Sequence, residues 1–185
     1  MRPLLLSLSL SLLASPLLAA DAAPACADLF KTSLRKLHSD ESVDLCALTA
    51  GKPVLVVNTA SNCGFTGQFA GLEQLHKSYG PKGLVVLGVP SDDFFQEEDA
   101  ERDTAKVCYI NYGVTFTMLA PASVRGSDAL PLFKTLAERA DAAPKWNFTK
   151  YLVKADGSVA GHWGSRTAPD DAELVKAVEA LLPAP

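Results

Sequence analysis

Two near-continuous apolar segments constrain the fold of this chain most strongly. The first runs from Pro53 to Asn58 and the second from Leu84 to Val89, and in neither do apolar and polar residues alternate. Such runs are typical of strands buried on both faces, as in parallel sheets that helices cover on each side. Residues 66–79, between them, carry apolar side chains at helical spacing. The chain is therefore expected to be an α/β protein built on a strand-helix-strand unit.

The rest of the chain supplies further elements of the same kind. We expect helices at about 98–109, 128–139 and 167–181, a strand at 115–119, and a hairpin at 151–159 with an Asp156-Gly157 turn. An Asp-Gly pair between apolar residues is a strong hairpin signal. This order of elements predicts a thioredoxin-like fold, in which helices flank a central mixed sheet.

Residues 1–22 have the pattern of a secretory signal peptide. Arg2 precedes an apolar run through Leu18, and small residues follow it. We expect cleavage after Ala20 or Ala22. A lipoprotein anchor at Cys26 is disfavoured, because no leucine stands just before it and it lies far from the apolar run. Residues 23–185 would then form a single exported domain, periplasmic or secreted.

Composition argues against several classes of function. The net charge of -4 provides no basic surface for nucleic acid, and no segment after the leader is apolar enough for stable insertion into a membrane. Hydrophobic residues make up 48% of the chain, which suits one domain with a sizeable core. The three histidines share no metal-ligand spacing with each other or with the cysteines, so we expect no metal or organic cofactor.

Cys63 is the strongest candidate for chemistry. It follows the first apolar strand, at the edge of the sheet where α/β proteins bind ligands. The Cys63-Gly64 step is expected to open the next helix, which would place the sulfur near unpaired amide N–H groups and the positive end of the helix dipole. Both favour the thiolate, the nucleophilic form of cysteine. A small buried structural residue is the alternative.

The other cysteines allow a structural disulfide. Cys26 lies near the mature amino terminus and Cys46 lies before the first core strand, 20 residues later. A bridge between them would anchor the terminus and contribute roughly 3 kcal/mol in an oxidising compartment. Two unrelated thiols are the alternative. Cys63 and Cys108 would remain as a second pair.

Four blocks of this sequence resemble, in order and spacing, the signature blocks of the glutathione peroxidase family. They span Asn58 to Thr66, Leu87 to Ser91, Asn111 to Phe116 and Trp146 to Leu152. The resemblance covers roughly residues 26–182. It implies a thiol peroxidase that reduces hydrogen peroxide or organic hydroperoxides through a cysteine.

The resemblance also implies roles for single residues. Cys63 matches the peroxidatic residue, with cysteine in place of the selenocysteine of some relatives. Trp146 and Asn147 match the pair that completes the family's site and can donate hydrogen bonds. Asp93 aligns with the family's catalytic glutamine, and a carboxylate there would raise the thiol pKa unless it is protonated or turned away. Gln96, in a shortened loop, is the alternative for that role.

Cys108 matches the resolving cysteine of two-cysteine relatives, although a buried helix residue is the alternative. It would condense with the oxidised Cys63, and we expect local unfolding around Cys108 because the reduced fold holds the two apart. A thioredoxin-type dithiol protein, or else glutathione, would reduce the product. The short segment before the 128–139 helix lacks the insertion used for tetramer assembly, which implies a monomer.

Two other classes of function fit the same residues. An exported thiol-disulfide exchange protein or redox sensor would use Cys63 and Cys108 with little peroxidase turnover, but the chain lacks the Cys-x-x-Cys pair of such exchangers. A binding domain that has lost turnover is kept open by Asp93. Peroxide-dependent turnover distinguishes the peroxidase from both.

Overall fold

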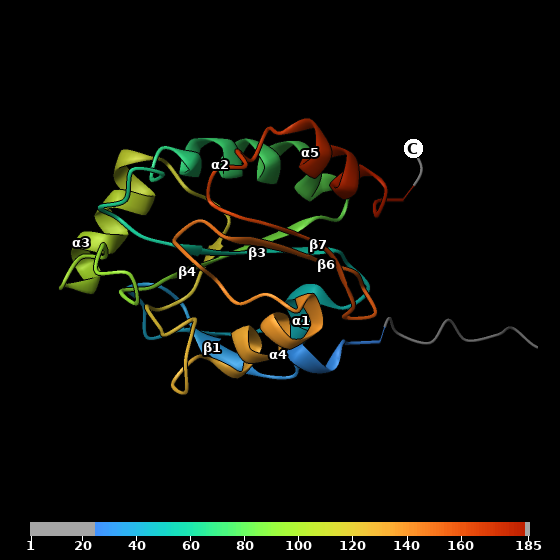
Figure 1. The fold of residues 1–185 in the computed structure, drawn as a ribbon, viewed down its shortest axis with the longest axis horizontal. Helices are drawn as coiled ribbons and strands as arrows, with labels where there is room; N and C mark the ends of the chain where they lie inside the picture. Colours follow the sequence, from blue (N-terminus) through green and yellow to red (C-terminus); the bar gives the residue numbers. More distant parts are fainter. Residues whose placement is uncertain (1–24, 184–185) are drawn as a thin grey trace, which may run out of the picture.

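The computed structural model describes residues 25–183, and its centre is a five-stranded mixed sheet (Figure 1). The predicted signal peptide at 1–22 lies outside the described residues. The strands are β3 (Val54–Thr59), β4 (Val85–Pro90), β5 (Thr117–Met118), β6 (Lys150–Val153) and β7 (Val159–Trp163), in the order β5-β4-β3-β6-β7. β4 pairs in parallel with β3 and β5, whereas β6 pairs antiparallel with β3 and β7. The predicted thioredoxin-like fold with a mixed sheet is confirmed.

Helices cover both faces of this sheet, as the unbroken apolar strands require. Helices α2 (Gln68–Tyr79) and α5 (Ala172–Glu179) cover one face, and α4 (Pro131–Ala140) and α1 (Leu45–Thr49) lie on the other (Figure 1). Along β3, Leu55 and Val57 pack in the cluster with α2 and α5, while Val54 and Val56 pack in the cluster with α4. Every residue of β3 and β4 is therefore buried.

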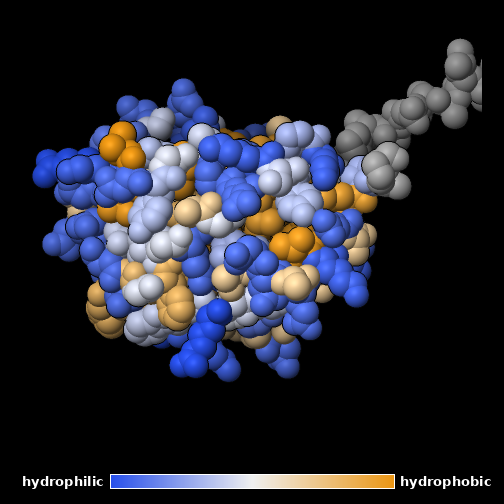
Figure 2. Space-filling model, turned by 90° about the horizontal axis from the view of Figure 1, so that it is seen from above, coloured by the Kyte–Doolittle hydropathy of each residue, from blue (hydrophilic) through white to orange (hydrophobic). Residues whose placement is uncertain are grey.

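The outer surface is mainly polar. Figure 2 views the face that carries α2 and α5 and shows a largely hydrophilic surface with small, separate apolar patches. Within residues 25–183, no helix is both long enough and apolar enough to cross a membrane.

The helix predicted at 66–79 begins later than expected, which corrects the placement of Cys63. Residues 61–67 form a series of turns, and α2 starts only at Gln68. Thr66 stabilises these turns: its Oγ1 accepts the amide N–H of Cys63 at 3.1 Å and lies 2.8 Å from the carbonyl oxygen of Cys63. A threonine that satisfies the backbone locally competes with helix formation. Cys63 therefore lies in a turn before the helix rather than in its first turn.

The helix predicted at 98–109 is also different. It consists of a five-residue helix, α3 (Glu101–Ala105), followed by a π-helical segment at Lys106–Asn111 that contains Cys108. π-helical turns are rare and frequently occur at functional sites. The hairpin predicted at 151–159 is confirmed as β6 and β7, with Gly157 at a φ of +88° in its turn.

Short elements near the amino terminus were not predicted from the sequence. Strands β1 (Ser33–Arg35) and β2 (Ser42–Asp44) form an antiparallel hairpin that leads into α1. Three-residue strands carry too little pattern to be recognised. The other boundaries shifted by a few residues, since β5 spans Thr117–Met118 and α5 ends at Glu179.

Glu73, a buried carboxylate on α2, joins this helix to Thr115, which lies just before β5. It accepts hydrogen bonds from the Thr115 amide at 2.7 Å and hydroxyl at 2.5 Å, and pairs with Lys77 at 3.1 Å. Glu73→Ala is expected to lower the free energy of unfolding by about 2 kcal/mol, because the amide and hydroxyl of Thr115 and the ammonium of Lys77 lose a buried charged partner. Urea denaturation at pH 7 measures the change.

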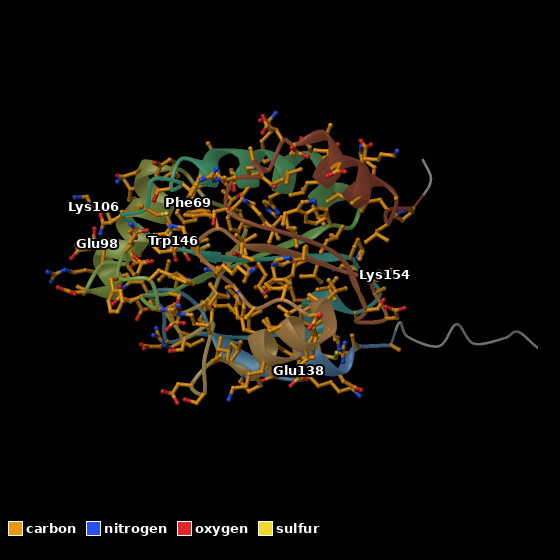
Figure 3. The ribbon with its side chains drawn as sticks, viewed as in Figure 1. Phe69, Glu98, Lys106, Glu138, Trp146 and Lys154 are labelled. Carbon is orange, nitrogen blue, oxygen red and sulfur yellow. A yellow bond between two sulfur atoms is a disulfide. The ribbon has the colours of Figure 1, made fainter. Side chains whose placement is uncertain are left out.

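The pH dependence and a control sharpen this test. Burial raises the pKa of the Glu73 carboxyl, but the bonds from Thr115 and Lys77 outweigh burial and hold the pKa below its ordinary value of 4.5. The stabilisation is therefore present above pH 4.5 and is lost as the pH falls below it. Glu138→Ala, at an exposed position of α4 (Figure 3), should change the free energy by less than about 0.5 kcal/mol. Equal effects of the two substitutions would contradict this role for Glu73.

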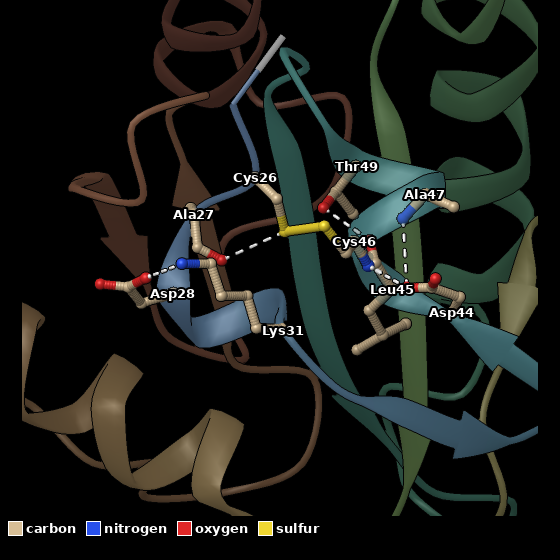
Figure 4. Close-up of a disulfide and its surroundings, with 9 residues drawn as sticks. All are labelled: Cys26, Ala27, Asp28, Lys31, Asp44, Leu45, Cys46, Ala47 and Thr49. Atoms are coloured by element: carbon tan, nitrogen blue, oxygen red, sulfur yellow. Dashed lines mark hydrogen bonds and ion pairs between the residues drawn. A yellow bond between two sulfur atoms is a disulfide. The ribbon is translucent and has the colours of Figure 1, made fainter. Parts of the chain in front are cut away.

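The structure joins Cys26 and Cys46 in a disulfide (Figure 4). Their Cα atoms lie 5.4 Å apart, and the bridge ties the start of the described chain to α1. Asp44 caps α1 by accepting the amide N–H groups of Cys46 at 2.9 Å and Ala47 at 3.2 Å. Cys63 and Cys108 remain free thiols.

Candidate active site

Cys63 lies in the turns beyond the carboxyl end of β3, which we call the Cys63 loop (residues 60–67). Its side chain is 8% exposed and packs in the same apolar cluster as Phe69, Phe148 and Cys108. The amide N–H of Phe65 lies 3.5 Å from the Cys63 sulfur and can donate to it. The sulfur is thus near the surface but shielded, with one backbone donor within reach.

Asn58, the penultimate residue of β3, fixes the turn that carries Trp146 and Asn147. Its side chain donates to the carbonyl oxygen of Trp146 at 3.2 Å and accepts the amide of Thr149 at 3.1 Å. Its own carbonyl accepts the amide of Phe148 at 2.6 Å. Phe148 is buried at a φ of +59°, a conformation that bulky residues rarely adopt without tertiary support. Asn58 therefore places this turn beside the Cys63 loop.

Gln96 connects the Cys63 loop to Asn147. Its carbonyl oxygen accepts the amide N–H of Asn62 at 2.8 Å, and its side-chain Oε1 accepts the Asn147 side-chain amide at 3.2 Å. Asn147 is fully buried, and its own carbonyl accepts the Ser165 hydroxyl at 2.5 Å. Its Oδ1 is buried and has no hydrogen-bond partner among the described residues.

Asp93 makes its hydrogen bonds away from Asn147, with a different segment of the chain. One carboxylate oxygen accepts the amides of Val124 at 2.6 Å and Arg125 at 3.0 Å, and the Asp93 carbonyl accepts the Arg125 side chain at 2.6 Å. The carboxylate thus holds the 124–125 segment instead of bonding to Asn147. The residue in hydrogen-bond contact with Asn147 is Gln96, the alternative that the shortened loop had suggested.

Trp146 lies at the same end of the molecule, near the surface. Its side chain is 41% exposed, and its ring centroid is 5.3 Å from that of Phe94. Figure 3 shows it at the end of the molecule that also carries Glu98 and Lys106. Within residues 25–183, neither its indole nor the Asn147 amide is hydrogen-bonded to the Cys63 sulfur. The hydrogen bonds of Gln96 to Asn62 and Asn147 nevertheless bring the segment of Trp146 and Asn147 to the Cys63 loop.

Cys108 is more deeply buried than Cys63, with 1% of its side chain exposed. Burial, reinforced by the negative charge of Glu97, raises the pKa of the Cys108 thiol to about 12. Cys108 is therefore a protonated, unreactive thiol in the closed structure at neutral pH. Of the two free cysteines, Cys63 is the less deeply buried.

Two positioning residues were not prominent in the sequence analysis. Asn58 was not singled out, and Gln96 was only the alternative to Asp93. Asn58 appeared only as the first member of a sequence block. A polar residue at the end of an otherwise apolar strand is the signal that could have identified it.

Comparison with known sequences places this site in a family. The family model for glutathione peroxidase matches residues 29–137. The chain is 44% identical over 128 residues to the glutathione peroxidase of Lactococcus lactis subsp. cremoris, an alignment that covers 66% of this chain and 82% of that relative. It is 43% identical over 143 residues to the hydroperoxy fatty acid reductase gpx1 of Synechocystis sp., with 71% and 83% covered.

Solved structures agree with this placement. The crystal structure of Trgpx in its apo form has a TM-score of 0.63 and 33% identity, with 84% of this chain and 98% of that chain covered. A thiol:disulfide interchange protein from Chlorobium tepidum has a TM-score of 0.62 at 18% identity, covering 88% and 99%, and at that identity shows the common fold alone. The family model, the relatives and the gathered residues lead to one conclusion: the chain belongs to the glutathione peroxidase family and is a glutathione peroxidase-like thiol peroxidase.

Proposed function

We propose that Cys63 is the peroxidatic residue, that Trp146, Asn147 and Gln96 assist it, and that Cys108 resolves the oxidised product. The observation that carries the proposal is the pair of hydrogen bonds by which Gln96 joins Asn62 to Asn147. These bonds bring the nucleophile and the donor block together at the carboxyl end of β3.

In the first step, the Cys63 thiolate attacks the distal oxygen of the hydroperoxide. The O–O bond breaks, Cys63 becomes a sulfenic acid, and the leaving oxygen takes a proton and departs as alcohol or water. Charge builds on that oxygen, so the N–H groups of Trp146 and Asn147 stabilise the transition state in a water-poor site.

In the second step, the Cys108 sulfur attacks the sulfenic sulfur of Cys63. The S–O bond breaks, an S–S bond forms, and hydroxide leaves as water with the thiol proton. The Cys108 segment (residues 101–112) must open locally, because Cys108 is buried in a helix. A thioredoxin-type dithiol protein, or else glutathione, then reduces the disulfide. The name of the Synechocystis relative supports organic hydroperoxides as substrates beside hydrogen peroxide.

The proposal includes export and assembly. Residues 1–22 would direct the chain out of the cytoplasm, and residues 23–185 would act as a single monomeric domain. The Cys26–Cys46 disulfide supports an oxidising compartment, where such bridges persist.

The direct test counts thiols in the mature protein before and after one equivalent of hydrogen peroxide. Intact mass and peptide mapping should find two thiols lost and a Cys63–Cys108 disulfide formed within seconds. Unchanged thiols at both positions after several minutes would contradict the proposal and favour a thiol-disulfide exchange role.

Substituting Gln96 tests which residue of the shortened loop serves the site. Gln96→Ala is expected to lower the second-order rate constant with hydrogen peroxide about 10- to 100-fold, because Asn147 loses its side-chain partner. Asp93→Ala is the matched control: it should lower the melting temperature but change the rate constant less than about threefold. Stopped-flow oxidation of the reduced proteins measures both. A larger kinetic effect at Asp93 than at Gln96 would restore the original assignment.

A further inference from the structure

Glu97 lies between the Cys63 loop and the Cys108 segment. Its Oε1 accepts a hydrogen bond from the Ser61 hydroxyl, another from the Thr104 hydroxyl at 3.0 Å, and the amide N–H of Glu98 at 2.8 Å. Ser61 comes two residues before Cys63, and Thr104 lies on α3, four residues before Cys108. One carboxylate oxygen therefore connects the segments that carry the two free cysteines.

The surrounding bonds hold the Cys63 loop but do not extend to α3. The carbonyl of Gln96 accepts the Asn62 amide at 2.8 Å, and the carboxylate of Glu98 accepts the Asn62 side chain at 3.2 Å. Within residues 25–183, the hydrogen bond from Thr104 to Glu97 is the only one that joins residues 96–98 to α3. It is also well buried, since Thr104 is 0% exposed and burial raises the pKa of the Glu97 carboxyl above its ordinary value.

A second tether holds the start of α3 from another side. The Glu101 carboxylate pairs with Arg35 at 2.7 Å and accepts the His38 amide at 2.6 Å. This ion pair is partly exposed, but Arg35 binds both carboxylate oxygens, at 2.8 Å and 2.7 Å, so it does restrain the start of α3. Arg35 and His38 therefore hold the start of α3 from one side, and Glu97 holds it from the side of the Cys63 loop.

The Cys108 segment depends on such restraints to stay folded. α3 has only five residues, and the six that follow are π-helical, a rare conformation that seldom extends beyond one turn. Helices this short are not stable without tertiary contacts. Loss of one buried contact should therefore raise the population of the open segment.

We propose that Glu97 is a latch that holds the Cys108 segment closed, and that release of Thr104 from Glu97 sets how fast Cys108 reaches the oxidised Cys63. The inference rests on the proposed function, because it concerns the second step described above. Glu97 acts as a positioning residue and does not touch the reacting sulfur atoms. The latch also determines how the Cys63 sulfenic acid divides between two products, the disulfide with Cys108 and the sulfinic acid. While the latch is closed, a second hydroperoxide can oxidise the sulfenic acid to sulfinic acid, with release of water or alcohol.

Hydrogen exchange tests the latch without any peroxide chemistry. In a Cys63→Ser protein with the Cys26–Cys46 disulfide intact, exchange of the amides in residues 101–112 is followed by mass spectrometry. Adding Glu97→Ala or Thr104→Val should increase exchange of this segment about tenfold. Glu97→Gln retains an acceptor oxygen and should have a clearly smaller effect. Thr49→Val, which removes a buried hydroxyl in α1, controls for general destabilisation.

Two results would overturn the latch. Exchange of residues 101–112 that is unchanged by Glu97→Ala would show that the contact restrains nothing. Equal increases from Glu97→Gln and Glu97→Ala would assign the effect to charge rather than to the hydrogen bonds.

Rapid-quench oxidation of the chain with all four cysteines gives the second readout. Glu97→Ala should form the Cys63–Cys108 disulfide several-fold faster and yield less sulfinic acid at high peroxide, with the rate of Cys63 oxidation unchanged. If the parent chain forms no such disulfide, the proposed function is wrong. The hydrogen exchange of residues 101–112 then still tests whether Glu97 holds this segment closed. If the parent chain forms the disulfide but Glu97→Ala forms it no faster, the latch is wrong and the proposed function stands.

Discussion

Replacing Cys63 with serine should lower the rate constant for reduction of hydrogen peroxide by at least about a thousandfold. A serine hydroxyl is not ionised near neutral pH and cannot cycle through a sulfenic acid, so the serine protein lacks the nucleophile at this position. Stopped-flow measurement of peroxide consumption, with a dithiol reductant in excess, gives the rate constant.

The control for this substitution is a measurement of whether the fold is retained. Serine is nearly isosteric with cysteine, so the melting temperature should stay within a few degrees and the Cys26–Cys46 disulfide should remain intact. Substantial turnover in the serine protein would move the chemistry to Cys108. Its burial and its pKa of about 12 argue against that outcome.

Replacing Cys108 with serine should separate oxidation from turnover. The first oxidation of Cys63 should keep its rate constant within about twofold, because Cys108 is protonated and takes no part in that step. Steady-state turnover with a thioredoxin-type reductant should fall about a hundredfold or more, since no disulfide forms for exchange. Mass spectrometry should then find Cys63 accumulating as sulfenic and sulfinic acid.

The same variant distinguishes the two reductants. Glutathione attacks the sulfenic acid of Cys63 directly, so turnover of the Cys108→Ser protein that glutathione sustains at the parent rate would identify glutathione as sufficient. Full turnover of this protein with the dithiol reductant would instead show that Cys108 is a structural residue and would contradict its resolving role.

Much of the fold follows from local patterns in the sequence. The apolar runs at 53–58 and 84–89 predicted strands buried on both faces, because a strand buries every side chain when helices cover both faces of its sheet. The Asp156-Gly157 turn predicted the hairpin, since glycine accepts the positive φ that the turn requires. The position of Cys63 after the first strand follows from the same order of elements. These signals are local, so they need no knowledge of distant contacts.

Other features depend on side chains that meet only in the folded chain. The sequence could align Asp93 with a catalytic glutamine, but hydrogen bonds to Val124 and Arg125 engage its carboxylate elsewhere. Competition between Thr66 and the helix start moved Cys63 out of α2 into a turn. Neither outcome is visible in a linear pattern, because each depends on which of several possible partners the fold brings within hydrogen-bond distance.

The sequence by itself determined the order of the elements, the buried sheet and the cysteine at its carboxyl edge, since apolar periodicity and turn residues act over a few positions. The tertiary structure alone decided that Asn58 and Gln96 align Asn147 with the Cys63 loop and that Glu97 joins Ser61 to Thr104. Ser61 and Glu97 are 36 residues apart in the sequence, and Asn58 and Thr149 are 91 residues apart, yet each pair is hydrogen-bonded. A polar side chain can form such a bond only after packing of the core has fixed both segments.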